Sequence, residues 1–249
     1  MMRSWHSWAL TGLSLVFLPA TTLAQASSIT EGFDDITTLA GNGWFSQNNS
    51  NPVGSTGWFQ GNPGVFVAHS GATSSYLAAN FNNAGNGPGL DTISNWMLTP
   101  VLDLSGGGTI TFFTRTIDAP GFPDRLQVRY SNAGASTDVG VGEFGVGDFT
   151  NLVLDINPNY NLVDYPNDWT QFIVNIPSGA DGRVAFRYFV EDAGPLGNNS
   201  DFIGIDTFTW QASPIPEPST ILLLGLAGAA TALRLPSLRR KLGQKVETE

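Results

Sequence analysis

Cysteine is absent from the 249 residues of this chain, and lysine is absent between positions 27 and 213. The lack of cysteine excludes disulfides, thiolate zinc sites and a cysteine nucleophile. Charged residues make up only 13% of the sequence, about half of the ~25% that is usual in globular proteins. The formal net charge of −10 argues against a nucleic-acid partner held through phosphate contacts.

Glycine and proline are abundant where charge is scarce, with 29 and 15 residues respectively. No stretch between positions 27 and 213 shows a long helical period of apolar residues. This combination favours many short strands that are joined by turns, and it argues against a helical bundle. Because hydrophobic residues still make up 41% of the chain, it can bury a core.

Residues 1–26 predict a secretory signal peptide that is removed from the mature protein. Arg3 precedes an apolar stretch from Ala9 to Leu18, and small residues then allow cleavage after Ala24 or Ala26. The alternative is a membrane anchor, but this stretch is much shorter than the ~20 residues of a spanning helix.

Residues 214–249 predict a membrane segment of a different kind. A proline-rich linker precedes an apolar run from Ile221 to Leu233, and a basic cluster follows the run. We expect one short transmembrane helix at about residues 219–235, with the basic tail on the cytoplasmic side of the inner membrane. A plain C-terminal tail anchor is the alternative.

The order of tripeptide, apolar helix and basic cluster at the C-terminus resembles the PEP-CTERM sorting signal of Gram-negative bacteria. The residues that carry the resemblance are Pro216, Glu217, Pro218, Arg239, Arg240 and Lys241. The resemblance implies recognition by an exosortase, a membrane-embedded processing enzyme found in species that make extracellular polysaccharide. It therefore implies a membrane-anchored precursor that then reaches the cell surface or the extracellular matrix.

The intervening residues 27–213 form the predicted exported domain, in which five arginines stand against 18 acidic residues, a balance of −13. Apolar and polar residues alternate from Leu126 to Tyr130 and from Val184 to Val190, and a β-branched and aromatic run spans Thr109 to Thr114. Such alternation predicts an all-β, two-sheet antiparallel jelly-roll sandwich. The glycine-rich segment from Gly134 to Asp148 is predicted to be a mobile loop.

Four short elements in this domain resemble the choice-of-anchor J family, a relative of cleaved-adhesin and MAM-type jelly rolls. They are Glu31-Gly32-Phe33-Asp34-Asp35, Asn95-Trp96-Met97-Leu98-Thr99-Pro100, the strand Arg183 to Tyr188, and Asp201-Phe202-Ile203-Gly204-Ile205-Asp206. The resemblance spans about residues 29–210. It implies a β-sandwich module of adhesion or matrix type, without a common enzymatic activity.

Acidic residues at the two ends of the domain suggest a structural Ca²⁺ site. Asp206 shares strand parity with Phe202 and Phe208, and a buried carboxylate is costly unless it is paired, hydrogen-bonded or bound to metal. In related jelly rolls, acidic residues at the start and end of the domain gather around Ca²⁺, which implies a site at Glu31, Asp34 and Asp206. The alternative is that these residues bond neighbouring backbone, or face solvent because a bulge shifts the parity.

Aromatic residues in a Gly/Asn/Ser-rich segment are the candidates for ligand contact. Trp44, Trp58 and Phe59 can stack on a sugar ring if they are exposed, whereas the alternative is that the tryptophans close the ends of the sandwich. A serine hydrolase would have to use His69, the one histidine left after signal removal, and the chain has no G-x-S-x-G motif.

Taken together, these patterns predict a non-enzymatic exported protein, sorted by an exosortase and associated with adhesion or with exopolysaccharide. A carbohydrate-binding lectin with a specific glycan ligand is the main alternative, and an uncharacterised hydrolase is the weaker one. The expected partners are the exosortase and an exopolysaccharide, and the expected cofactor is at most one structural Ca²⁺.

Overall fold

The computed structural model of the chain describes residues 28–87 and 91–214. The predicted signal peptide at 1–26, the predicted helix at about 219–235 and all six residues assigned to the sorting signal lie outside the described residues. Within the ranges that the structure describes, no helix is both long enough and apolar enough to cross a membrane.

One sheet of the described domain has six strands. Its order is β3-β4-β11-β6-β9, and β1 pairs with the half of β11 that β4 leaves free. Every pairing in it is antiparallel. The strands are β1 (Ser28–Glu31), β3 (Phe59–Gln60), β4 (Leu77–Asn80), β6 (Gly108–Arg115), β9 (Thr170–Ile176) and β11 (Phe202–Ala212).

The second sheet has five strands in the order β2-β5-β10-β7-β8, again with antiparallel pairs throughout. Its strands are β2 (Phe45–Asn48), β5 (Asp91–Leu98), β7 (Leu126–Ser131), β8 (Asn151–Ile156) and β10 (Arg183–Ala193). Two short 3-10 helices, η1 (Ile36–Thr38) and η2 (Phe81–Asn83), lie in the connections.

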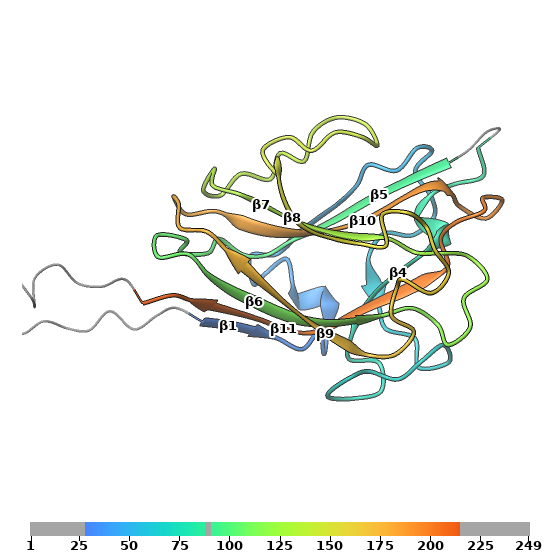
Figure 1. The fold of residues 1–249 in the computed structure, drawn as a ribbon, viewed down its shortest axis with the longest axis horizontal. Helices are drawn as coiled ribbons and strands as arrows, with labels where there is room; N and C mark the ends of the chain where they lie inside the picture. The colour runs from blue at the N-terminus through green and yellow to red at the C-terminus, as the bar shows by residue number, and fades with distance from the viewer. Residues whose placement is uncertain (1–27, 88–90, 215–249) are drawn as a thin grey trace, which may run out of the picture.

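The two sheets stack face to face and enclose one main core (Figure 1). Phe186 of β10 packs edge-on against Phe112 and Phe208 of the opposite sheet, with ring centroids 4.9 and 5.9 Å apart. The alternate residues of β7 and β10 that were expected to face inward all contribute to this core. The prediction of an all-β, two-sheet antiparallel sandwich is therefore confirmed.

Both ends of the described domain leave the sandwich at the same end. β1 runs antiparallel to the last residues of β11, so that Ser28 pairs with Gln211. Figure 1 shows these two strands side by side at the left, while the loops that precede β5 and β11 lie at the right. A strand of 11 residues such as β11 separates the two ends of the sandwich by roughly 30 Å.

The segment from Gly134 to Asp148 is packed, and the prediction of a mobile loop missed this packing. Val139 and Phe149 are buried against Trp96 and Leu98 on the outer face of the five-stranded sheet. Gly140 permits the tight fold of the segment, because its φ is +81° and a Cβ would stand 2.7 Å from the backbone nitrogen of Gly147. Val139 within the segment and Phe149 directly behind it anchor the segment on the sheet, and Val146 packs against the same cluster.

Candidate functional site

Asp206 lies at a β-bulge in β11. Because of this bulge, Asp206 and Phe208 do not share a face of the sheet, although their parity predicted that they would. Ile205 and Phe208 both face the main core, although an unbroken strand would turn them to opposite faces. The register between β11 and β6 shifts between Asp206 and Thr209, and Thr207 has a positive φ of 51°. Asp206 therefore points to the outer face of the six-stranded sheet, as the bulge alternative anticipated.

A turn covers the carboxylate of Asp206 on that outer face. Oδ2 accepts a hydrogen bond of 3.0 Å from the backbone N–H of Ser70, and Oδ1 accepts one of 2.5 Å from Thr207. Burial raises the pKa of Asp206, and these backbone donors partly offset the rise. Neutral donors thus satisfy a buried carboxylate that has no ion pair among the described residues.

The other two acids of the predicted calcium site approach the same region without forming a cluster. Asp34 Oδ1 lies 3.0 Å from the position that a Cβ would take on Gly71, next to the Ser70 that contacts Asp206. Glu31 instead accepts a 2.8 Å hydrogen bond from the backbone N–H of Phe33. In the described part of the chain, no three Asp, Glu or His side chains are placed to hold a metal ion.

His69 contacts the same bulge. Its Nδ1 lies 3.0 Å from Thr207 Oγ1, and its ring stacks on Phe113 with a centroid distance of 3.6 Å. A catalytic triad requires an acid that orients the histidine through its other ring nitrogen. Here the side chain of Asp206 bonds Thr207 instead, so this group lacks the order of a triad.

The three aromatic residues that were candidates for ligand contact separate in the structure. Trp44 is only 4% exposed and packs edge-on against Phe33 and Phe208, with centroid distances of 5.6 and 5.4 Å. Trp58 is half-buried against the same core and borders a small cavity of about 110 Å³ beside Trp44. Trp44 therefore closes the core, which was the alternative interpretation.

Phe59 of β3 belongs to a second aromatic cluster. It meets Phe202 edge-on at 5.7 Å, and Phe202 meets Phe66 at 5.3 Å. The cluster lies on the outer face of the six-stranded sheet, where Phe66 also carries the guanidinium of Arg115 at 4.6 Å from its ring centroid. Phe59 is half-buried and stands at the margin of this cluster.

Beside that margin, three adjoining pockets open at the end of the sandwich opposite to β1. Their volumes are about 140, 630 and 420 Å³. Asp201 and Phe81 line the first two, and Asp118 lines the second and the third. We call the three pockets together the distal hollow. Sequence reasoning missed it because its walls come from loops that lie far apart in the chain.

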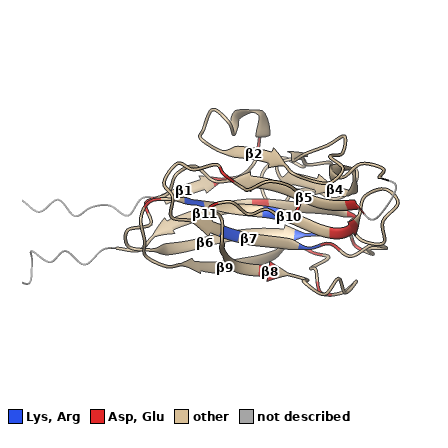
Figure 2. Ribbon diagram, turned by 90° about the horizontal axis from the view of Figure 1, so that it is seen from above, with Lys and Arg blue, Asp and Glu red and all other residues tan. Residues whose placement is uncertain are grey.

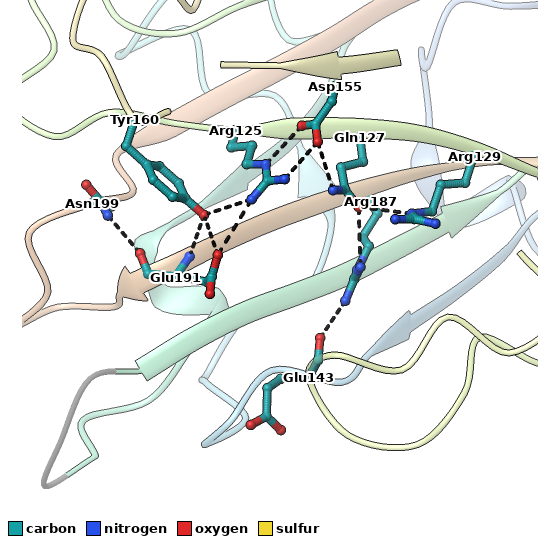
Figure 3. Close-up of polar contacts among 9 residues, drawn as sticks. All are labelled: Arg125, Gln127, Arg129, Glu143, Asp155, Tyr160, Arg187, Glu191 and Asn199. Carbon is teal, nitrogen blue, oxygen red and sulfur yellow. Dashed lines mark hydrogen bonds and ion pairs between the residues drawn. The ribbon is translucent and has the colours of Figure 1, made fainter. Parts of the chain in front are cut away.

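A polar network on the outer face of the five-stranded sheet was also missed (Figure 3). Arg125 binds both carboxylate oxygens of Asp155, at 2.9 and 2.7 Å, and donates a 3.3 Å hydrogen bond to the hydroxyl of Tyr160. The hydroxyl of Tyr160 in turn donates to Glu191 at 3.4 Å. Hydrogen bonding to Asp155 raises the pKa of Arg125, so this side chain stays charged.

Arg187, on the neighbouring strand β10, clamps the segment 134–148 to the sheet. Its guanidinium lies over the rings of Phe189 and Trp96, at 4.0 and 4.8 Å, and donates a 2.5 Å hydrogen bond to the carbonyl of Glu143. Burial lowers the pKa of Arg187 to about 9, which still leaves it protonated at neutral pH. Figure 2 shows basic positions on β7 and β10 side by side, in a domain whose charge is otherwise acidic. The outward alternation of Arg129 on β7 and of Arg187 on β10 was the sequence signal for this network.

Comparison with known proteins assigns the C-terminal part of the chain. Residues 214–240 match the family model described as the PEP-CTERM protein-sorting motif. The motif thus begins just after β11 has ended, and it contains five of the six residues assigned to the signal. The remaining residue, Lys241, directly follows the match.

The chain is similar in sequence to parts of much larger proteins. It is 30% identical over 142 residues to Gingipain R1 and to Lys-gingipain of Porphyromonas gingivalis. The match covers 53% of this chain but only 8% and 7% of those two proteins. The chain therefore spans less than a tenth of the length of these curated relatives.

Solved structures show the same fold. The K3 cleaved adhesin domain of Lys-gingipain from Porphyromonas gingivalis superposes with a TM-score of 0.52 at 21% identity, covering 76% of this chain and 99% of that domain. The K2 cleaved adhesin domain of Lys-gingipain gives 0.50 at 19% identity, covering 75% and 99%. The chain thus carries a PEP-CTERM protein-sorting motif directly behind a β-sandwich with the fold of the cleaved adhesin domains.

Proposed function

We propose that this protein is exported and sorted to the cell surface or the extracellular matrix, where its sandwich acts as a non-enzymatic adhesive module. The sorting motif at 214–240 carries this proposal. The relatives named as adhesin domains support the adhesive part of it. The expected partners are an exosortase-type enzyme at the inner membrane and an exopolysaccharide outside the cell.

The arrangement of the domain fits this role. Because Ser28 pairs with Gln211, the sorting motif follows the end of the sandwich at which both described ends meet. The distal hollow lies at the other end, roughly 30 Å away along β11. A chain held at its C-terminus would present the hollow outward, away from the membrane.

Replacing Pro216, Glu217 and Pro218 together with alanine is expected to block processing by the exosortase. The full chain is expressed in a Gram-negative host with and without an exosortase, and the cell fractions are probed for its size and location. We expect the unchanged chain to lose its C-terminal segment and reach the surface only when the exosortase is present. The triple variant is expected to stay in the inner membrane in both hosts.

Replacing Pro214, which lies outside the tripeptide, with alanine is the matched control and is expected to be sorted normally. A triple variant that is processed and released like the unchanged chain would contradict the exosortase route.

We also propose that a calcium ion binds beside the Ser70–Gly71 turn, which Asp34 from the first part of the domain sequence and Asp206 from the last part both approach. Carboxylate oxygens suit Ca²⁺, and backbone carbonyls would have to complete the shell because Glu31 bonds Phe33 instead. Calcium at 100 times its Kd is expected to stabilise the fold by about 2.7 kcal/mol.

Calorimetric melting of the full chain with calcium and with a chelator measures this effect. The variant Asp34→Asn, which alters an exposed carboxylate, is expected to lose the response, whereas Asp181→Asn, an exposed acid elsewhere, keeps it. If the melting temperature of the original chain is the same with calcium and with the chelator, the proposed calcium site is wrong.

A further inference from the structure

The distal hollow has the size of a ligand site and an unusual lining for the surface of a soluble domain. Its largest pocket, of about 630 Å³, lies within the range of ~300–1,000 Å³ that is typical of small-molecule sites. Phe59, Phe81 and Ile117 are half-buried and line this pocket, so that part of each side chain faces the opening. Phe122, which is 46% exposed, lines the adjoining pocket.

Hydrogen-bonding groups stand around these apolar surfaces. Asp118 and Asp201 line the largest pocket, together with Asn62 and Asn80, whose side-chain oxygens also accept hydrogen bonds from Gly64 and Asn82. Asp118 lies at the rim with a side chain that is 91% exposed. Among the described residues, no Lys, Arg or His lines any of the three pockets. The hollow therefore offers mainly acceptors and apolar faces, with a negative charge.

The residues that line the hollow are held in place by hydrogen bonds, an ion pair and ring contacts. Arg115, which is 8% exposed, forms an ion pair with Asp118 and donates a 2.6 Å hydrogen bond to the carbonyl of Asn167. The backbone of Asp118 accepts a 3.1 Å hydrogen bond from the Asn167 side chain. Beneath the hollow, the ring of Phe202 is fixed edge-on by Phe59 and Phe66. Such support reduces the entropy that a ligand would otherwise lose on ordering the site.

From this lining we infer that the distal hollow binds an uncharged oligosaccharide. Sugar rings have apolar faces that stack on aromatic side chains, and hydroxyl groups that donate to carboxylates and amide oxygens. Phe59 and Phe81 supply the stacking surfaces, and Asp118 and Asp201 accept hydrogen bonds from the hydroxyls. A polyanionic glycan is disfavoured, because both charged groups in the lining are carboxylates and the whole domain is acidic.

The first pocket shares Phe81 and Asp201 with the second, and the second shares Asp118 with the third, so the three pockets follow one another across the end of the sandwich. That shape suits an internal stretch of a glycan chain rather than a single terminal sugar. The inference deepens the adhesive role proposed above, and it rests on that role for its biological setting. Its chemistry is tested separately from export.

Binding is measured by calorimetric titration of the full-length chain in detergent with cellohexaose, xylohexaose and mannohexaose, and with hexagalacturonate as the acidic comparison. We expect at least one neutral hexasaccharide to bind and the acidic one not to bind. Phe59→Ala and Asp118→Asn are each expected to weaken this binding about tenfold. The matched controls are Phe144→Ala, an aromatic residue that is 61% exposed on another surface, and Asp181→Asn; neither is expected to change the affinity.

Asp118→Asn keeps the size of a side chain that is 91% exposed. It removes the charge that pairs with Arg115, but Arg115 keeps its hydrogen bond to the carbonyl of Asn167, so this variant is expected to fold even if Phe59→Ala proves unstable. The inference is overturned if none of the neutral hexasaccharides binds in the millimolar range, if hexagalacturonate binds as well as they do, or if Asp118→Asn binds like the original chain. None of these results affects the outcome of the sorting experiment, because that experiment measures surface delivery without any glycan. Failure of sorting together with intact glycan binding would remove only the proposed location.

Discussion

Replacing Trp44 with alanine is expected to lower the free energy of unfolding by about 3–5 kcal/mol, the usual cost of truncating a large buried aromatic residue. Trp44 is 4% exposed and touches Phe33 and Phe208 edge-on, so the variant loses its contacts with β11 and with the segment behind β1, and it leaves a cavity. For a domain of this size the loss corresponds to a melting temperature about 10 °C lower. Chemical and thermal denaturation of the full-length chain measure it.

Phe144→Ala provides the matched comparison, because Phe144 is also aromatic but is 61% exposed. We expect that variant to change stability by less than about 0.5 kcal/mol. If Trp44→Ala were as stable as the original chain but bound no glycan, Trp44 would be a ligand contact and the packing argument would be wrong. The same pair of variants therefore decides between the two interpretations that the sequence left open.

The strands were predictable because their pattern depends only on neighbouring residues. In β10, Val184, Phe186 and Tyr188 face the core, as alternation requires. Two packed sheets are the simplest way to bury several such faces at once. The sandwich could thus be predicted without knowing which strand pairs with which.

The face of Asp206 could not be predicted in the same way. One extra residue at a bulge moves every later side chain to the other face, and the register shift between Asp206 and Thr209 contains no glycine that would mark it. Thr207 nevertheless adopts a positive φ of 51°, which is unusual for a β-branched residue. The acid is buried as expected, but on the outer face and under a turn that contains Ser70.

The distal hollow and the arginine network required the tertiary structure. The hollow joins Phe59, Asp118 and Asp201, which are separated by many tens of residues, and no local pattern brings them together. Arg187 alternates with core residues, so its outward direction was predictable. Its cover was not, because the packing of segment 134–148 depends on where Val139 and Phe149 find apolar partners.

Asp124 is a buried carboxylate that neutral donors surround, and it makes the stability of the fold depend on pH. It is 0% exposed. Its Oδ1 accepts hydrogen bonds from the Tyr188 hydroxyl at 2.5 Å and the Asp201 backbone at 2.8 Å, and its Oδ2 accepts one from Thr116 Oγ1 at 2.6 Å. Burial raises the pKa of Asp124 to about 6, against 3.8 for an ordinary aspartate. No cationic side chain forms an ion pair with it in the described part of the chain.

The direction of the pH effect follows from proton binding. Between pH 3.8 and about 6 the folded state holds a proton on Asp124 that the unfolded chain has lost, so the free energy of unfolding falls as the pH rises through this window. The full effect of this residue is about 3 kcal/mol. Burial also raises the pKa of Asp201 and of Asp206, which adds to the effect with the same sign. Denaturant unfolding at pH 4.5 and pH 7.5 is therefore expected to show a more stable protein at the lower pH.

Asp124→Asn is expected to remove most of this pH dependence and to raise stability at pH 7.5. The amide oxygen can accept from Tyr188 and from the Asp201 backbone, while the amide nitrogen donates to Thr116 Oγ1. That hydroxyl in turn has an acceptor in the carbonyl of Phe202 at 3.0 Å, so every polar group keeps a partner once the buried charge is gone. Asp181→Asn, which changes an exposed acid, should leave the pH profile as it is. A variant at Asp124 with an unaltered profile would show that the pKa of this carboxyl does not differ between the folded and unfolded states, and that other groups carry the dependence.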